Sequence, residues 1–224
     1  MESKKIAADR AVGSVKSGMV VGLGTGSTAY WAIQAIGARV KTGLNIQAVA
    51  TSEKSEALAR ELDIPIVPFS DIDSIDITID GADEVDTDLN AIKGGGGALL
   101  REKIVAAASR ELIIIADESK LVQRLGAFPL PVEVVPFGIE LTMKKLAALL
   151  ACPLNLRQTE DKLFLTDNRN YIVDCHLGAI EDAVQLNQAL NMIPGVVENG
   201  LFIHMAAKVI VGFNDGTVRE LTNT

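Results

Sequence analysis

Two different rhythms of apolar and polar positions alternate along the first half of the chain. Short runs rich in valine, isoleucine and alanine have the length and composition of buried strands. The longer stretches between them repeat their apolar positions every three or four residues, which predicts helices. Strands and helices alternating in this way are typical of an α/β fold with a largely parallel sheet. The predicted strands cover 19–21, 46–50, 64–67, 75–79 and 112–115, and the predicted helices cover 4–17, 29–36, 52–62 and 98–109.

The pattern changes at Phe128-Pro-Leu-Pro131, which we predict to be a domain boundary. Beyond it the elements follow the order of a small α+β module. A last hairpin, turned by Asn214-Asp-Gly216, is expected to rejoin the first domain. We therefore predict one domain from residues 1–127 plus 206–224, and a smaller α+β domain from 128–205. The predicted elements of this part are strands 132–135 and 196–204, helices 138–150 and 181–192, and hairpins 163–165 with 171–173 and 209–211 with 218–221.

Composition and charge exclude two classes of partner. The 224 residues are 48% hydrophobic and 22% charged, which is ordinary for a globular protein. No apolar run approaches the ~20 residues that a membrane helix needs, and the first ten residues carry too many charges for a signal peptide. A net charge of −8 argues against nucleic acid, which needs a basic surface. We expect a cytoplasmic protein without a membrane or nucleic-acid partner.

The first glycine-rich loop, Gly22-Leu-Gly-Thr-Gly-Ser-Thr28, stands between a predicted strand and a predicted helix. Glycines allow the backbone to approach a ligand closely, and a helix start presents free N–H groups, so this order favours phosphate binding. A plain strand–helix turn with a capping serine is the alternative. The loop also partly matches a dinucleotide fingerprint, but Ser27 occupies the place of the third glycine, which makes a nicotinamide-dependent dehydrogenase less favoured.

A second group of polar residues lies between positions 80 and 103. Asp80 and Asp83 follow a predicted strand, Lys93 precedes four glycines, and Glu102 lies in the opening turns of a predicted helix. Carboxylates, a cation and bare backbone N–H groups are what proton transfer beside a carbonyl requires. The glycines could instead form a flexible linker. The acidic residues could form a solvated turn or a divalent-metal loop, although Lys93 would compete with a metal ion.

Three loops are expected to meet at one edge of the sheet. The first glycine loop and Asp80 both follow the carboxyl end of a predicted strand, and Lys120 follows another. Ligands of open α/β sheets bind outside the carboxyl ends of the strands. These segments are therefore predicted to face one crevice, although Lys120 by itself could equally be a solvated surface lysine.

Five linked motifs in this order resemble the A-type ribose-5-phosphate isomerases. They are G-L-G-T-G-S-T, D-G-A-D-E-V-D, K-G-G-G-G-A-L-L-R-E-K, A-D-E-S-K and F-P-L-P-V-E-V-V-P, and I-P-G-V-V-E-N-G-L-F near the end is similar too. The resemblance implies a Rossmann-like domain with a mostly parallel sheet and a smaller ferredoxin-like α+β domain. It also implies a homodimer or homotetramer, without metal or cofactor, that interconverts ribose 5-phosphate and ribulose 5-phosphate through an enediolate in the pentose phosphate pathway.

Matching motif positions assign roles to individual residues. By this resemblance Glu102 is the proton-transferring base, and Asp80 and Asp83 serve ring opening and the sugar hydroxyls. Lys93 and the second glycine loop steady the enediolate oxygen. The substrate-binding residues implied are Thr25, Gly26, Ser27, Thr28, Asp80, Gly81, Ala82, Asp83, Lys93, Gly94, Gly95, Gly96 and Lys120.

Two rival functions belong to other classes. A regulator that senses sugar phosphates could share this fold, but no basic segment precedes the first predicted strand. A coenzyme A transferase could use the glycine loop for phosphates, but it needs a nucleophilic carboxylate apart from Asp80 and Asp83.

Overall fold

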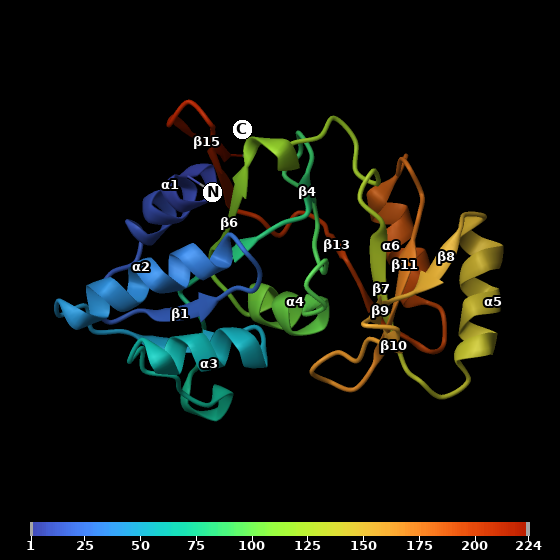
Figure 1. Cartoon of the computed structure of the whole chain (residues 1–224), viewed down its shortest axis with the longest axis horizontal. Coiled ribbons are helices and arrows are strands. Elements are labelled where there is room, and N and C mark those ends of the chain that lie inside the picture. Colours follow the sequence, from blue (N-terminus) through green and yellow to red (C-terminus); the bar gives the residue numbers. More distant parts are fainter. Residues whose placement is uncertain (1, 223–224) are drawn as a thin grey trace. The chain divides into compact units, whose positions relative to one another are not determined.

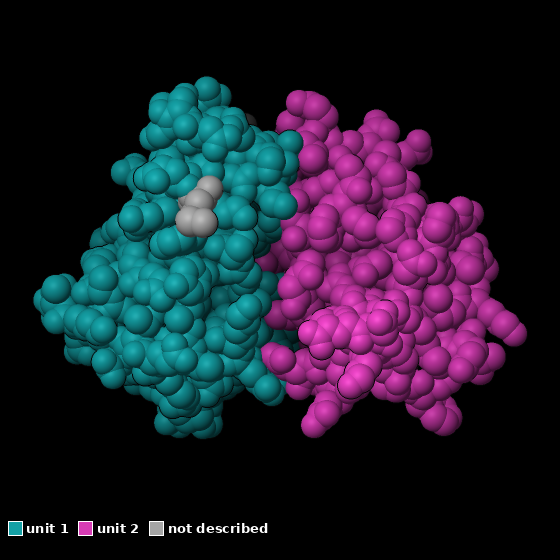
Figure 2. Space-filling view, in the orientation of Figure 1, with its two compact units in different colours: residues 1–82, 101–121, 204–224 teal, residues 83–100, 122–203 magenta. Residues whose placement is uncertain are grey.

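The computed structural model describes residues 2–222, which group into two compact units (Figure 2). Of these residues, unit 1 comprises 2–82, 101–121 and 204–222, and unit 2 comprises 83–100 and 122–203. Residues 83–100 thus join unit 2, whereas the sequence-based division at 128 and 206 places them in the first domain. The reason is strand pairing, because the short strands of this segment pair with one another and with a strand at 201–202.

Unit 1 is built on a six-stranded sheet in the order β15-β14-β6-β3-β1-β2 (Figure 1). The pairs from β2 to β14 are parallel, and only the edge pair of β14 with β15 is antiparallel. This confirms the α/β fold with a mostly parallel sheet. The strands are β1 (Val20–Leu23), β2 (Gln47–Ala50), β3 (Ile77–Gly81), β6 (Leu112–Asp117), β14 (Lys208–Gly212) and β15 (Val218–Thr222). The helices are α1 (Glu2–Val12), α2 (Ala29–Lys41), α3 (Glu53–Glu61) and α4 (Leu99–Ala107), with 3-10 turns η1 (Phe69–Asp71) and η2 (Glu118–Lys120).

Helices cover both faces of this sheet (Figure 1). Ala8 of α1 and Ile33 of α2 pack with Ile79 of β3 in one apolar cluster. Val105 of α4 packs on the opposite face. A Cβ atom added to Gly22 would lie 2.9 Å from Cγ1 of Val105. Glycine in β1 therefore allows α4 to approach the sheet closely.

The strand order of unit 1 reverses direction next to β1. The chain runs from β1 to β2 on one side and then returns to β3 on the other side. The carboxyl ends of β1 and β3 therefore form a topological switch point, which is where doubly wound sheets bind ligands. The first glycine loop and Asp80 both lie at this point, as the sequence predicted.

Unit 2 contains a four-stranded antiparallel sheet in the order β12-β7-β11-β8. Its elements follow one another as β7, α5, β8, β11, α6 and β12, which is the β-α-β-β-α-β order of a ferredoxin-like fold. Alternate residues such as Val132 and Val173 face the helices and form the core of this unit. The elements are β7 (Leu130–Val134), α5 (Ile139–Leu150), β8 (Leu154–Leu156), β11 (Tyr171–Cys175), α6 (Ala183–Asn191) and β12 (Val196–Asn199).

Short strands complete unit 2. One small sheet has the order β13-β5-β4, and a two-stranded sheet pairs β9 with β10. The predicted strand over 196–204 is divided into β12 and β13 at Gly200. Their bounds are β4 (Glu84–Val85), β5 (Ala91–Ile92), β9 (Gln158–Thr159), β10 (Lys162–Leu163) and β13 (Leu201–Phe202).

Two predicted elements are wrong. Residues 163–165 do not pair with 171–173, because β11 pairs with β7 and β8 while β10 turns back onto β9. Residues 64–67 form only a single bridge, between Ile66 and Ala48, instead of a strand. Apolar alternation shows which segments can extend but not which partner each one meets. Among residues 2–222, every helix is too short or too polar to span a lipid bilayer.

Candidate active site

The loop between β1 and α2 in unit 1 has the geometry of an anion-binding loop. Gly24 lies so near Asp80 that a Cβ on it would be 2.2 Å from Asp80 Oδ1. Gly26 has φ +107°, in the region that favours glycine. The loop leads into α2, whose first turn carries no acidic side chain. The N–H dipoles of that turn therefore favour a negatively charged ligand.

The hydroxyl groups of this loop have different neighbours. Thr25 Oγ1 lies 2.7 Å from Thr51 Oγ1 and 2.8 Å from Ser52 Oγ, in a cluster of hydroxyls at the start of α3. Ser27 is exposed, and its hydroxyl accepts a 2.8 Å hydrogen bond from Lys4 Nζ. The Thr25 hydroxyl thus fixes the loop, whereas the Ser27 hydroxyl faces outward with a cation beside it.

Lys4 is a functional candidate that the sequence analysis missed. Its ammonium contacts Ser27 and lies 3.9 Å from Oδ2 of Asp117, the last residue of β6. Burial alone would raise the pKa of Asp117, but hydrogen bonds from Ser119 and the nearby Lys4 and Lys120 charges lower it below its ordinary value. Both lysines therefore lie near the edge of the sheet that carries the first glycine loop. No spacing in the sequence relates residue 4 to residue 27, and only the packing of α1 against α2 brings them together.

Two carboxylates of unit 1 are almost fully buried. Asp80 is 1% exposed, and its Oδ1 atom accepts hydrogen bonds from the N–H groups of Thr25 (2.9 Å) and Gly81 (2.7 Å). Glu102 is 4% exposed and lies in the first turn of α4. A carboxylate shielded from bulk water and placed on a rigid helix can act as a proton-transferring base.

The second glycine run forms a closed turn in unit 2. The N–H of Gly97 donates a 3.0 Å hydrogen bond to the carbonyl of Gly94, and both residues have positive φ values, +83° and +104°. The N–H of Gly95 donates to Asp83 Oδ2 at 2.7 Å, and a Cβ on Gly95 would lie 2.6 Å from Asp83 Oδ1. The run is therefore a tight turn that only glycine allows, and not a linker.

Lys93 enters this turn from a buried position. Its side chain is 2% exposed, with Nζ 5.3 Å from the centroid of the Phe202 ring. The backbone N–H of Lys93 donates a 2.9 Å hydrogen bond to the carbonyl oxygen of Gly200. A Cβ atom on residue 200 would lie only 2.4 Å from the backbone carbonyl oxygen of Lys93. Glycine at position 200 therefore permits the close backbone contact that holds Lys93.

The neighbouring acids have structural partners. Glu84 is buried and accepts backbone hydrogen bonds from Gly126 (2.7 Å) and Phe128 (2.6 Å). Asp86 accepts bonds from the N–H groups of Asp88 and Asn90 and so closes its own turn. Within residues 2–222, no group of three or more His, Cys, Asp or Glu side chains is arranged to hold a metal ion.

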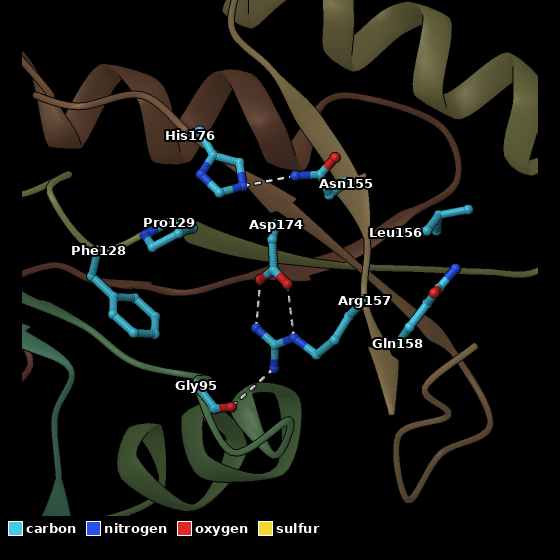
Figure 3. Close-up of a pocket in the computed structure, with 9 residues that line it drawn as sticks. All are labelled: Gly95, Phe128, Pro129, Asn155, Leu156, Arg157, Gln158, Asp174 and His176. Carbon is cyan, nitrogen blue, oxygen red and sulfur yellow. Dashed lines mark hydrogen bonds and ion pairs between the residues drawn. The ribbon is translucent and has the colours of Figure 1, made fainter. Parts of the chain in front are cut away.

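Arg157 is a second residue that the sequence analysis missed. Its guanidinium pairs with Asp174 and contacts the carbonyl oxygen of Gly95 at 3.2 Å (Figure 3). It also contacts the carbonyl oxygen of Gly94 at 2.7 Å. A cavity of about 410 Å³ opens beside it within unit 2, bordered also by His176 and Phe128. No glycine or charge pattern connects residue 157 with residue 94, so the sequence held no signal for this contact.

The predicted site residues thus fall into two sets, one in each unit. The chain passes from unit 1 to unit 2 after Ala82 and returns to unit 1 at Arg101. In unit 1 the structure joins the first glycine loop to Asp80, and in unit 2 it joins the second glycine turn to Asp83. Unit 1 holds Thr25, Gly26, Ser27, Thr28, Asp80, Gly81, Ala82, Glu102 and Lys120, and unit 2 holds Asp83, Lys93, Gly94, Gly95 and Gly96.

Comparison with known proteins gives one consistent family. Residues 47–216 match the family model described as ribose 5-phosphate isomerase A (phosphoriboisomerase A). The ribose-5-phosphate isomerase A of Bacillus mycoides (strain KBAB4) is 53% identical over 217 residues, which are 96% of this chain and 98% of the relative. That of Streptococcus agalactiae serotype III (strain NEM316) is 53% identical over 216 residues, 96% of each chain.

Solved structures agree with this similarity. The ribose 5-phosphate isomerase from Plasmodium falciparum superposes with a TM-score of 0.95 at 41% identity, covering 99% of this chain and 98% of that one. A D-ribose-5-phosphate isomerase in complex with phospho-erythronic acid gives a TM-score of 0.94 at 41% identity, covering 98% of this chain and 97% of that one.

Proposed function

The chain belongs to the ribose 5-phosphate isomerase A family and interconverts D-ribose 5-phosphate and D-ribulose 5-phosphate, and we propose that it does so through an enediolate with Glu102 as the base. The pathway that this reaction serves is the pentose phosphate pathway. The assignment of roles to individual residues rests on the matched motifs together with the burial and contacts described above.

The reaction moves one proton between neighbouring carbon atoms. The Glu102 carboxylate takes the proton from C2 of the open-chain aldose, the C1–C2 double bond forms, and the carbonyl electron pair moves to O1. The carboxyl group then returns the proton to C1 while the proton on O2 passes to O1 and the C2 carbonyl forms. A positioned base of this kind contributes about 10²–10⁴-fold to the rate.

The negative charge that develops on O1 needs fixed donors. We assign this role to the Lys93 ammonium and to the N–H groups of the second glycine turn other than those of Gly95 and Gly97, which donate to Asp83 and to the Gly94 carbonyl. Lys93 is buried, and a charge held in a site poor in water stabilises an oxyanion more strongly than it would in bulk solvent. Loss of one such donor costs about 3–4 kcal/mol in comparable oxyanion sites.

The remaining groups bind the two ends of the sugar. Asp80 and Asp83 are assigned to ring opening and to the sugar hydroxyls, together with the backbone of Gly81 and Ala82. Residues 25–28 and Lys120 are assigned to the phosphate. The start of α2, with the exposed Ser27 hydroxyl and the Lys4 ammonium beside it, supports this part of the proposal.

One observation carries the assignment of the base. Glu102 is almost fully buried in the first turn of a helix that begins directly after the second glycine turn. We expect Glu102→Gln to lower kcat at least 10³-fold with little change in KM, since the amide keeps the shape but cannot accept the proton. The control is Glu61→Gln, which alters an exposed carboxylate at the end of α3. Turnover of the Glu102→Gln enzyme near the control's rate would remove Glu102 from the mechanism.

A relative was solved in complex with phospho-erythronic acid. This compound carries a phosphate at one end and a carboxylate at the other, and the two carboxylate oxygens resemble O1 and O2 of an enediolate. We propose that it competes with ribose 5-phosphate here and binds more tightly than the substrate, because such analogues use the donors that act in the transition state. Weaker binding than substrate, measured by calorimetry on wild type, would contradict the enediolate.

We further propose a cytoplasmic location and a homodimer or homotetramer. The family resemblance supports both assignments. Light scattering coupled to gel filtration measures the mass of the assembly, which can be compared with the 23.8 kDa mass of one chain. A single peak at the mass of one chain would contradict the oligomer.

A further inference from the structure

Arg157 contacts two carbonyl groups of the second glycine turn, and Figure 3 shows its hydrogen bond to Gly95. Its Nη1 atom donates to the Gly94 carbonyl at 2.7 Å and to the Gly95 carbonyl at 3.2 Å. Its Nε atom donates to Asp174 Oδ2 at 2.9 Å, and Nη2 pairs with the other oxygen of the same carboxylate. The guanidinium is thus fixed on one side by Asp174 and holds the turn with its remaining nitrogen.

The peptide between Gly94 and Gly95 is held at both ends. Arg157 binds its carbonyl oxygen, and Asp83 accepts from its N–H at 2.7 Å. The next peptide, between Gly95 and Gly96, has its carbonyl oxygen on Arg157 as well. Every peptide bond in the described chain is trans. A trans peptide directs its N–H opposite to its carbonyl, so the Gly96 N–H must point away from Arg157.

We propose that Arg157 is a positioning residue for the isomerisation, which turns the Gly96 N–H outward as a donor to the enediolate oxygen. The proposal rests on the function assigned above to the second glycine turn. Arg157 acts only by holding two carbonyl groups and does not itself touch the substrate.

Neighbouring side chains explain why the position needs arginine. Asp174 takes two nitrogens of the planar guanidinium, and the third is left for the two carbonyls. A lysine has one nitrogen and cannot serve Asp174 and both carbonyls with the same geometry. The guanidinium carbon of Arg157 lies 5.9 Å from the centroid of the Phe164 ring. The same ring packs on the glycine turn, because a Cβ atom added to Gly97 would lie 2.3 Å from Phe164 Cζ.

The first experiment separates kcat from KM. We expect Arg157→Met to lower kcat at least tenfold and toward 10²-fold, because displacement of a donor by about 1 Å has an effect of that size. KM should change less than about threefold. His176→Ala is the matched control, since His176 borders the same cavity but its ring bonds to Asn155, and the variant should keep kcat within about twofold. Unchanged kcat in Arg157→Met, or equal losses in both variants, overturns the proposal.

Chemical rescue tests position against simple loss of stability. The cavity of about 410 Å³ beside Arg157 gives small molecules access to the vacated place. We expect millimolar guanidinium to raise kcat of Arg157→Ala at least threefold, and to leave Arg124→Ala, an exposed arginine of the same unit, unchanged. Equal responses of the two variants would show that the side chain acts only on stability.

Amide hydrogen exchange makes the result independent of the chemistry assigned to Glu102. Peptides covering residues 93–98 should exchange at least tenfold faster in Arg157→Met, while peptides of α5 should not change. Slow exchange in the variant overturns the proposal. If Glu102→Gln remains active but the turn loosens in Arg157→Met, the proposed base is wrong while the positioning role stands.

Discussion

The backbone N–H of Thr25 donates a 2.9 Å hydrogen bond to Oδ1 of Asp80, which lies 55 positions further along the chain. This bond joins the loop after β1 to the end of β3, on the two sides of the switch point of the parallel sheet. A group assigned to the sugar and a loop assigned to the phosphate are thereby held at a fixed separation in unit 1.

The Gly24–Asp80 contact predicts a strong effect from one added methyl group. We expect Gly24→Ala to reduce kcat/KM at least tenfold, because its Cβ would lie 2.2 Å from Asp80 Oδ1 and must displace either the carboxylate or the loop. Gly13→Ala, whose Cβ would meet only a carbonyl oxygen at 3.1 Å, is the control. Steady-state kinetics and circular dichroism separate lost activity from lost folding. Equal kcat/KM in the two variants would contradict the prediction.

The two lysines near Asp117 predict the strength of anion binding. We expect inorganic phosphate to compete with substrate, and Lys4→Met and Lys120→Met each to raise its inhibition constant roughly tenfold, since a hydrogen bond from a charged group is worth about 1.5–3 kcal/mol. KM should rise in parallel. Lys16→Met, on the surface of the same unit, provides the control for net charge. Inhibition constants equal to that of the control would place the phosphate elsewhere.

The acidic segment predicts different outcomes for neighbouring carboxylates. We expect Asp83→Ala to lower kcat about 10²-fold, because the Gly95 N–H loses its acceptor and the sugar loses a polar partner. Asp86→Ala should leave kcat within twofold and lower the free energy of unfolding by about 1 kcal/mol, because Asp86 closes its own turn. Kinetics together with urea unfolding measure both effects. The assignment fails if Asp86→Ala loses as much kcat as Asp83→Ala.

A buried carboxyl group of unit 2 predicts how stability depends on pH. Glu133 is 0% exposed, and burial raises its pKa above the ordinary value of 4.5 despite hydrogen bonds from Asn170 and Thr166. Within the described residues its Oε2 atom has no hydrogen-bond partner. The folded chain therefore holds this proton more tightly than the unfolded chain does.

The sign of the effect follows from proton linkage. The contribution of Glu133 to stability is fully present below pH 4.5 and is lost as the pH rises through the raised folded pKa. The side chain of Glu133→Gln does not ionise, so we expect the variant to escape this loss. The unfolding free energy of the variant should therefore rise relative to that of wild type as the pH increases above 4.5. Urea unfolding over a pH series measures it. A difference that stays constant with pH would contradict the raised pKa.

Local pattern was enough for much of the fold. The buried runs at β1, β3 and β6 and the amphipathic helices between them were predictable, since a period of two or of 3.6 residues can be read from neighbours in sequence. The hairpin over 163–173 failed because both of its segments are extended, but each pairs with a different strand. Strand pairing is chosen by long-range packing, which a local pattern does not contain.

The sequence by itself determined the residue types of the chemistry: the glycine runs, Asp80, Asp83, Lys93 and Glu102 stand in motifs that specify an isomerase family. Only the tertiary structure decided which side chains support them. Lys4 reaches Ser27 through the packing of α1, and Arg157 reaches Gly94 across 63 positions. Such contacts arise because side chains distant in the chain become neighbours only after strands and helices have packed, and no spacing along the chain encodes that distance.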